Sequence, residues 1–409
     1  MARIGIIGSG VAGLQLGLAL RQRGMTATIY AERTPEQQLD CQLSNMVARN
    51  GCTRERERLL GVNHWDSRLH DMPRLLLSIR GPRTMAFCGS MGAPAQAVDM
   101  RIYWARLLED FSARGGRVIV RTIQAQELDS LAAQYDLLVV ASGRAGLSSI
   151  FPRVPEQSPF TRPQRLVIGG LFRGVSSSEP RALEVVTTPG SGEILAMPVQ
   201  SFEPDLTGIG ILIAAGGQFE PLRHLRHKDD PKAFIAAILE LLRHHAPSVY
   251  ERIDERRFDV SRPQDLAHAA ITPTVRRGFI ELPLGRLAVA LGDAHVLMDP
   301  ITGQGANNAS HAAGVLADAI CTAREFDRAF CSRVEREISS YAVPVSEAAN
   351  ARLQPPTPHF RELLAAAARD QRVADVYADG YNHPDRFWAI ASSPGATAAL
   401  LASGQAIPA

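Results

Sequence analysis

A glycine-rich turn near the N-terminus constrains the fold of this chain more than any other feature of its sequence. Residues 4–7 form a short apolar run typical of a buried parallel strand, and the run Gly8-Ser-Gly-Val-Ala-Gly13 follows at once. The apolar spacing predicts a helix from Val11 to about Arg23 and a second strand over 26–30. Glycines at this turn let the backbone approach a pyrophosphate, and the helix N-terminus favours its negative charge. The chain is therefore predicted to begin with a Rossmann-like α/β domain that binds a dinucleotide.

An acidic residue completes this fingerprint. Glu32 stands just beyond the second predicted strand, where its carboxylate can accept hydrogen bonds from both ribose hydroxyls of an adenosine. An ordinary glycine-rich turn would not need strand, helix, strand and acid in this order, although the fingerprint alone does not distinguish FAD from NAD. The predicted contacts to this half of the cofactor are Gly8, Gly10, Val11, Ala12, Gly13, Glu32 and Arg33.

A second motif near residue 290 favours FAD. Residues 287–291 form another apolar strand that ends in Gly292-Asp293, and the segment Asp299-Pro-Ile-Thr-Gly-Gln-Gly-Ala-Asn307 leads into a helix through Ala319. An aspartate after this strand can accept from the ribityl hydroxyls of FAD, which NAD lacks. The glycines let backbone amides approach the isoalloxazine ring, and a helix start favours negative charge there; a plain strand-to-helix loop is the alternative. The predicted contacts here are Asp293, Gly303, Gln304, Gly305, Ala306 and Asn307.

Two segments between the motifs fit the same domain. Arg101 opens an amphipathic helix that ends at Gly115-Gly116, and its side chain either pairs with the FAD pyrophosphate or is an ordinary surface arginine. Residues 136–143 form a buried strand that closes on a small-residue turn. This turn is predicted to bring Gly143 near the adenosine.

Short β-rich runs predict a second sheet. They lie between about 75 and 87 and from 166 to 214, and they indicate an antiparallel sheet that walls a substrate pocket over the flavin. A helix over 232–245 is expected to pack on this sheet, and the pattern after residue 320 is helical with a break at Pro355-Pro356. The predicted divisions are 1–70, 96–160 and 265–322 for the FAD-binding domain, 71–95 and 161–264 for the β-rich substrate domain, and 323–409 for a helical C-terminal region.

Composition excludes several classes of protein. A net charge of +2 does not favour binding to nucleic acid. Five cysteines without a CxxC pair argue against a disulfide framework or a thiolate zinc site and fit a reducing cytoplasm. The glycine-broken N-terminus is unlike a signal peptide, and no apolar stretch reaches transmembrane length. His224 and His227 are interpreted as part of a charged loop, so no metal site is predicted.

Six stretches spread over nearly the whole chain resemble those of the styrene and indole monooxygenases. They are Gly8–Gly17, Ser44–Asn50, Ala93–Tyr103, Tyr135–Gly143, Asp299–Asn307 and Tyr381–Arg386. The resemblance implies a fold like glutathione reductase and p-hydroxybenzoate hydroxylase, and a two-component system in which a separate NADH-dependent reductase supplies reduced FAD. The oxygenase component then forms a flavin C4a-hydroperoxide that oxidises a small aromatic substrate. Typical products are epoxides of styrene-like alkenes, or the indole oxide that leads to indigo.

The resemblance also implies which residues shape the site. Asn45 and Val47 match family positions that line the pocket near the flavin, and Pro300, Ile301 and Thr302 are expected to border the reactive face of the ring. Weaker pocket candidates on the predicted strands are Leu75, Met197, Pro198 and Ile209. Because oxygen transfer to an alkene is electrophilic, such a site has to orient an apolar substrate and keep water out.

The sequence departs from the family at positions that bear on the substrate. Arg49, Met72 and Leu75 stand where epoxidising members carry histidines and a tyrosine, and Gln42 replaces an arginine. Asn45 and Val47 are of the styrene type, whereas Leu75 and Ala95 are closer to the indole type. The sequence therefore leaves both substrates open.

Three alternatives share parts of this pattern. A self-sufficient aromatic hydroxylase of the same fold would carry an Asp-Gly pair where this chain reads Ala141-Ser-Gly-Arg-Ala-Gly146. A flavin-dependent halogenase would carry a Trp-x-Trp-x-x-Pro stretch and an active-site lysine, whereas Lys228 and Lys232 are the only lysines here and lie in a charged loop. A non-enzymatic flavin-binding protein would carry the same motifs. The sequence does not choose between a monomer and a homodimer.

Overall fold

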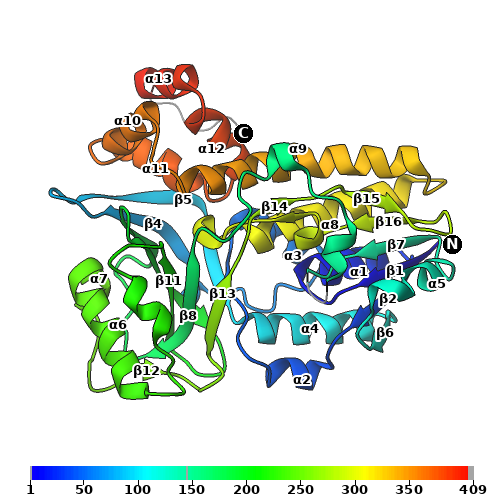
Figure 1. Cartoon of the computed structure of the whole chain (residues 1–409), viewed down its shortest axis with the longest axis horizontal. Helices are drawn as coiled ribbons and strands as arrows, with labels where there is room; N and C mark the ends of the chain where they lie inside the picture. The colour runs from blue at the N-terminus through cyan, green and yellow to red at the C-terminus, as the bar shows by residue number, and fades with distance from the viewer. Residues whose placement is uncertain (1, 144–145, 404–409) are drawn as a thin grey trace.

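The computed structural model describes residues 2–143 and 146–403 and contains two large β-sheets that lie side by side (Figure 1). The first sheet has the order β15-β16-β7-β1-β2-β6, and all neighbours run parallel except β15 and β16. Its strands are β1 (Arg3–Ile7), β2 (Thr26–Ala31), β6 (Arg117–Val120), β7 (Leu137–Val140), β15 (Phe279–Glu281) and β16 (Leu287–Ala290). This order confirms the predicted Rossmann-like domain.

Helices enclose the first sheet. Helix α1 packs against α4 and α8, and α9 packs on α8, so α1 is buried along most of its length. A helix enclosed in this way needs apolar residues all round, and Leu14, Leu16 and Leu18 are fully buried. The helices of this part are α1 (Val11–Gln22), α2 (Pro35–Leu39), α3 (Gly51–Leu59), α4 (Met100–Ala113), α5 (Leu128–Ala132), α8 (Gly305–Thr322) and α9 (Arg328–Arg352).

The second sheet is mixed, so the expected antiparallel sheet was wrong in part. Its order is β12-β8-β11-β10-β9-β4-β5-β3, and β13 also pairs with β8. The β4–β5 hairpin comes from a part of the chain far from β9, so no tight turn connects β4 to β9. These two strands run parallel. The strands are β3 (Ala48–Arg49), β4 (Met72–Ile79), β5 (Met85–Val98), β8 (Leu166–Arg173), β9 (Ala182–Thr188), β10 (Gly192–Gln200), β11 (Leu206–Ile213), β12 (Asp259–Val260) and β13 (Leu266–Ala270).

The boundary between the sheets differs from the predicted divisions. Strands β3 and β13 and the last residues of β5 join the second sheet, although their sequence ranges were assigned to the FAD-binding domain. Strand β13 pairs with β8, and β3 pairs with the last part of β5, so backbone hydrogen bonds attach these segments to the second sheet. A small separate pair, β14 (Thr274–Val275) and β17 (Val296–Leu297), lies close to the end of the first sheet.

Each face of the second sheet packs on a different set of helices. One face meets α6 (Pro231–His245) through a cluster that includes Phe234 and Ile238, which confirms the predicted packing of that helix. The other face meets the C-terminal helices, which gather above the β4–β5 hairpin in Figure 1. The remaining helices are α7 (Pro247–Tyr250), α10 (Pro358–Ala367), α11 (Gln371–Asp379), α12 (Pro384–Ala391) and α13 (Pro394–Ser403).

Helix α11 covers the outer edge of β5. Asp375 accepts the backbone N–H of Ser90 at 2.7 Å, Asp379 accepts that of Gly92 at 2.8 Å, and Gln371 donates to the carbonyl of Cys88 at 2.8 Å. The three side chains are four residues apart, so they project from one face of the helix. They satisfy strand groups that would otherwise offer an open sheet edge.

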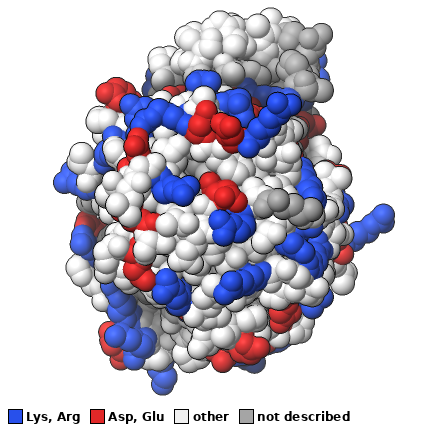
Figure 2. Space-filling model, turned by 90° about the vertical axis from the view of Figure 1, so that its right-hand side faces the viewer, with Lys and Arg blue, Asp and Glu red and all other residues white. Residues whose placement is uncertain are grey.

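The surface carries charges of both signs. Figure 2 shows basic side chains scattered among acidic ones on the face that it presents, rather than merged into one basic patch. Among the described residues, no helix is long and apolar enough to cross a membrane, and no cluster of three histidine, cysteine or acidic side chains could hold a metal ion. The five cysteines are unpaired within the same part of the chain.

Candidate active site

The first glycine-rich loop leaves a helix N-terminus open. A Cβ atom on Gly13 would lie 2.0 Å from the carbonyl oxygen of Gly8, so this position requires glycine for close packing of α1 on β1. Gly8 has φ of +115°, a conformation that favours glycine. Within the described ranges, by contrast, a Cβ on Gly10 would meet nothing within 4 Å, and no side chain caps α1. The first backbone N–H groups of α1 are therefore available to an anion.

Three loops converge at the ends of the first-sheet strands. A Cβ on Gly143 would lie 3.1 Å from the Cβ of Asp293, and one on Gly292 would lie 3.0 Å from the Cβ of Ala12. The turns after β1, β7 and β16 thus meet at one edge of the sheet, where ligands of open α/β sheets bind. Residues 144 and 145 of the turn after β7 lie outside the described part of the chain.

The two predicted carboxylates lie at this same edge. Glu32 and Arg33 follow the end of β2 and are half-buried, and Asp293 is exposed after β16. Asp293 is therefore accessible to a ligand that enters between the loops. These positions are compatible with contacts to the two sugar parts of a dinucleotide.

The second glycine-rich loop leaves another helix N-terminus open. The turn η7 (Pro300–Thr302) leads through Gly303, which has φ of +63°, to α8. Among residues 2–143 and 146–403, no side chain caps α8, and a Cβ on Gly305 would meet nothing within 4 Å. Thr302 Oγ1 and Gln304 Oε1 are buried and lack hydrogen-bond partners among the described residues. Open backbone amides and unpartnered polar atoms fit the polar edge of an isoalloxazine ring.

Two residues of this loop differ from their predicted roles. The Asn307 side chain accepts from Asn50 N and Thr53 Oγ1 and donates to the carbonyls of Ala48 and Gly303. All four hydrogen-bonding positions of its amide are used by the protein, so this side chain positions the loop instead of binding the cofactor. Ile301 does not present its side chain to a ring either, because it is buried in a small apolar cluster.

Arg101 corrects a further prediction. Its guanidinium is fully buried and pairs with Asp99 and Asp265, both at 2.6 Å. The other donors reach Asp99 again and the backbone carbonyls of Cys41 and Gln264. All five N–H groups therefore point at protein oxygens, and none is left for a pyrophosphate. Arg101 ties the start of α4 to the segment before β13.

The segment with Asn45 and Val47 bridges the two sheets. Leu43 N donates to the carbonyl of Gln264 at 2.9 Å at one end, and Asn307 holds the other end. Asn45 is exposed and Val47 is 8% exposed. Met46, between them, was missed by the sequence analysis.

Met46 lies over the second sheet. A Cβ on Gly169 would lie 3.1 Å from its Cε, and one on Gly208 would lie 3.1 Å from its Sδ. These glycines stand in β8 and β11, where strands normally carry larger side chains. Glycine inside a strand was therefore the available signal for a close approach.

The four weaker pocket candidates lie on two different faces of the second sheet. Leu75 and Met197 lie in the apolar cluster that also contains Ala48 and Tyr381, next to the second glycine-rich loop. Ile209 lies in the cluster on the opposite face, against α6. Pro198 follows Met197 in β10, so its side chain lies on the opposite face of the sheet from Met197, because side chains alternate along a strand. The pocket role is therefore wrong for Ile209 and unsupported for Pro198.

The late Tyr381-Asn-His-Pro stretch locks the loops together. Tyr381 is buried, donates from its hydroxyl to the carbonyl of Ala48 at 2.7 Å, and accepts at its own carbonyl from Gln304 Nε2 at 3.0 Å. Asn382 accepts from Gly51 N at 2.8 Å and donates to the carbonyl of Ala93 at 3.0 Å. Burial raises the pKa of the Tyr381 phenol, so it acts as a neutral donor.

Arg49, one of the departures from the family, belongs to a buried polar network. It pairs with Glu57, which also accepts from the Tyr103 hydroxyl at 2.9 Å, and it donates to Gln96 at 3.1 Å. Gln15 of α1 in turn donates to the Tyr103 hydroxyl at 2.8 Å. The network connects α1, α3, α4 and β5.

Two buried titratable residues follow β16. His295 is 2% exposed, and burial lowers its pKa to about 4, so it is neutral near pH 7. Its Nδ1 has no hydrogen-bond partner among the described residues. Asp299 is 1% exposed, and burial raises its pKa to about 6. Asp299 was not predicted as a site residue, although it opens the second glycine-rich motif.

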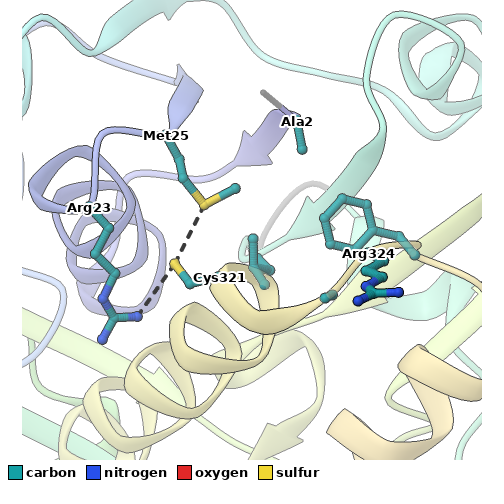
Figure 3. A pocket seen from close by; sticks show the side chains of 8 residues that line it. Ala2, Arg23, Met25, Cys321 and Arg324 are labelled. Atoms are coloured by element: carbon teal, nitrogen blue, oxygen red, sulfur yellow. Dashed lines mark hydrogen bonds between the residues drawn. The ribbon is translucent and has the colours of Figure 1, made fainter.

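A separate cavity lies at the far end of α1 (Figure 3). Its lining includes Arg23, Met25, Cys321 and Arg324, and the Cys321 thiol lies 3.5 Å from Met25 Sδ and 3.6 Å from Arg23 Nη1. Arg23 follows the C-terminal end of this 12-residue helix, about 18 Å along its axis from the first glycine-rich loop. This cavity is not part of the converging loops.

Comparisons with known proteins identify the family. Residues 143–252 match the family model "Styrene monooxygenase A putative substrate binding domain". Over 396 residues the chain is 37% identical to styrene monooxygenase StyA of a Pseudomonas species and to StyA of Pseudomonas fluorescens, covering 96% of this chain and 95% of each relative. The chain belongs to the styrene monooxygenase family. Members of this family are flavin-dependent monooxygenases, and the two open helix N-termini agree with a flavin cofactor.

Solved structures share the fold of this styrene monooxygenase family member at low identity. A triple mutant of the flavin-dependent brominase Bmp2 has a TM-score of 0.66 at 17% identity, covering 94% of this chain and 98% of the brominase. The flavin-dependent halogenase CmlS has a TM-score of 0.66 at 16% identity, covering 96% and 77%. PqsL of P. aeruginosa in complex with 2-aminobenzoylacetate has a TM-score of 0.60 at 15% identity, covering 92% and 99%. These likenesses establish the fold alone.

Proposed function

We propose that the chain is the oxygenase component of a two-component monooxygenase that epoxidises styrene-like vinyl aromatics, indole, or both. In this proposal a separate NADH-dependent reductase supplies the FAD in its reduced form. The supporting observation is 37% identity, over nearly the full length of both chains, to two styrene monooxygenases. The two open helix N-termini beside the converging loops support the same proposal.

The protein's part in this reaction is to bind, orient and shield. Reduced flavin, when bound, would supply the two electrons that activate dioxygen; one oxygen atom of the dioxygen goes to the substrate and the other leaves as water. Backbone amides at the start of α1 would hold the pyrophosphate, while Glu32 and Asp293 accept from the ribose and ribityl hydroxyls. Leu75 and Met197, in the apolar cluster next to the loop before α8, would orient the aromatic substrate and exclude water, together with Met46.

The decisive experiment mixes the purified protein with reduced FAD and substrate without oxygen, and then adds oxygenated buffer. We expect styrene oxide by chiral chromatography, indigo by absorbance of the extract, and no oxidation of NADH by the protein alone. Rapid NADH oxidation would favour the self-sufficient aromatic hydroxylase. Tight flavin binding with both substrates unchanged would favour a non-enzymatic flavin-binding protein.

A variant of Val47 tests the substrate side separately. Val47→Phe should change the rate or the enantiomer ratio without loss of flavin, because the residue is buried in the segment between the two sheets. Apolar pockets distinguish methylene-sized changes by about 1–3 kcal/mol. Val120→Phe is a matched control, since Val120 is 44% exposed on β6. Equal effects of the two variants would contradict a pocket role for Val47.

A further inference from the structure

Asp299 is a buried carboxyl group with one oxygen left over. Its Oδ1 accepts the backbone N–H of Ile301 at 3.0 Å, and its Oδ2 has no hydrogen-bond partner among the described residues. A buried, ionised carboxylate normally has both oxygens hydrogen-bonded. Oδ2 is therefore a place where a proton can be held.

The charged groups that face Asp299 come from the second sheet. Arg165, just before β8, donates to Glu193 on β10 through hydrogen bonds of 2.8 and 3.0 Å. The negative charge of Glu193 therefore offsets much of the effect of the Arg165 charge on Asp299. Burial is the main cause that raises the pKa of Asp299; Glu193 acts in the same direction and Arg165 opposes it. His295, on the same segment, is neutral near pH 7 because burial lowers its pKa to about 4.

Unpartnered polar atoms continue across the interface with α9. Ser346 Oγ and Asn350 Oδ1 are buried without hydrogen-bond partners in the described part of the chain. They flank Ala349, which packs against Ile301 of the loop. The described buried face of α9 adds no charged side chain here. Buried polar atoms of this kind are normally satisfied by water, so this part of the interface is polar enough to hold it.

We propose that Asp299 takes up a proton when reduced flavin binds beside the loop before α8, and releases it when the flavin leaves. The proposal rests on the proposed function, in which the bound cofactor is reduced FAD. The reduced isoalloxazine ring ionises near neutral pH, and two negative charges in a water-poor site repel each other. The proton passes from solvent to Oδ2, so ring and carboxyl together carry one negative charge instead of two. The affinity for reduced flavin then depends on pH through Asp299.

The test compares dissociation constants of reduced FAD for the wild type and Asp299→Asn without oxygen, from about pH 5 to about pH 8. The ratio of wild-type to variant constant cancels the ionisation of free reduced FAD, which is the same in both titrations. We expect this ratio to rise about tenfold over the range, which corresponds to an increase of about one unit in the pKa of Asp299 on binding. The sign follows because wild-type binding weakens as Asp299 loses its proton above about pH 6, whereas asparagine stays neutral.

Matched variants separate the outcomes. Asp327→Asn is the control. Asp327 also accepts a backbone N–H, that of Phe330 at 2.8 Å, but it is exposed. The ratio of the wild-type dissociation constant to that of Asp327→Asn should therefore not change with pH. Arg165→Gln removes the positive charge that lowers the pKa of Asp299. The midpoint of the pH dependence of its dissociation constant for reduced FAD should therefore lie at higher pH than in the wild type. This comparison tests the proposal even if Asp299→Asn does not fold. A flat ratio for Asp299→Asn, or an unmoved midpoint for Arg165→Gln, overturns the inference while flavin still binds. A wild type that binds neither oxidised nor reduced FAD overturns the proposed function.

Discussion

Replacing Arg49 tests a fully buried ion pair beside the candidate site. Arg49 is 2% exposed and its partner Glu57 is 0% exposed. Glu57 keeps one other donor, the Tyr103 hydroxyl at 2.9 Å. Arg49→Met therefore removes the cation and leaves a carboxylate where water does not reach it.

The expected loss is large and depends on pH. Removing one partner of a buried pair lowers the free energy of unfolding by about 3–5 kcal/mol. Burial raises the pKa of Glu57 even beside Arg49, and more so without it. Between the ordinary pKa of about 4.3 and the raised value, the folded variant holds a proton that the unfolded chain has released. Its stability therefore falls as pH rises through this window, and the double variant Arg49→Met/Glu57→Leu should recover most of the loss.

Urea unfolding at about pH 5 and about pH 8 measures this loss. Tryptophan fluorescence is a suitable signal, because Trp65 stacks on Tyr103 at 4.9 Å and lies 5.5 Å from the Arg49 guanidinium. A loss below about 1 kcal/mol would mean that the pair is solvated like a surface pair. The reasoning also fails if the loss is equal at both pH values, or if the double variant is no more stable than the single one.

Three further predictions concern the loops and the sheet edge. Gly10→Ala should weaken flavin binding without changing the melting temperature of the flavin-free protein. Gly13→Ala should both weaken flavin binding and lower that melting temperature, because the Cβ added at Gly13 meets the backbone of Gly8. Flavin titration measures the binding, and calorimetry measures the melting temperature. Asp293→Ala should weaken FAD binding more than Glu32→Ala at the same salt concentration, and equal small losses in titrations would contradict the reading of the second motif. Asp375→Ala should destabilise the protein by about 1–3 kcal/mol, because a strand N–H loses its acceptor, and hydrogen exchange should rise in β5 but not in β1.

Local sequence signals predicted the nucleotide-binding domain well. The strand, glycine turn and helix over residues 3–22 are set by short-range periodicity and by one close approach, that of Gly13 to Gly8. The same kind of signal located the helix predicted over 232–245 and the β-rich runs within 75–87 and 166–214, but it did not indicate β3, β12 or β13. It did not give their directions, because the pairing of β4 with β9 depends on a contact between distant segments.

Side-chain partners were beyond these signals. Arg101 and Asn307 were predicted to touch the cofactor from their positions in motifs, yet both have every donor bound to protein groups. The acceptors lie far away in the sequence: Asp265 is 164 residues from Arg101, and Ala48 is 259 residues from Asn307. No local pattern reports such a pairing.

The sequence by itself determined the order of strands and helices, the two glycine-rich turns, and the family to which the chain belongs. These depend on the spacing of apolar residues and glycines over a few positions. The tertiary structure alone decided which polar groups are already satisfied by the protein and which are left for a ligand or a proton. The physical reason is that hydrogen-bond saturation and burial depend on every element that packs around a group, so Asp299 differs from any other aspartate only once β8, β10 and α9 have closed around it.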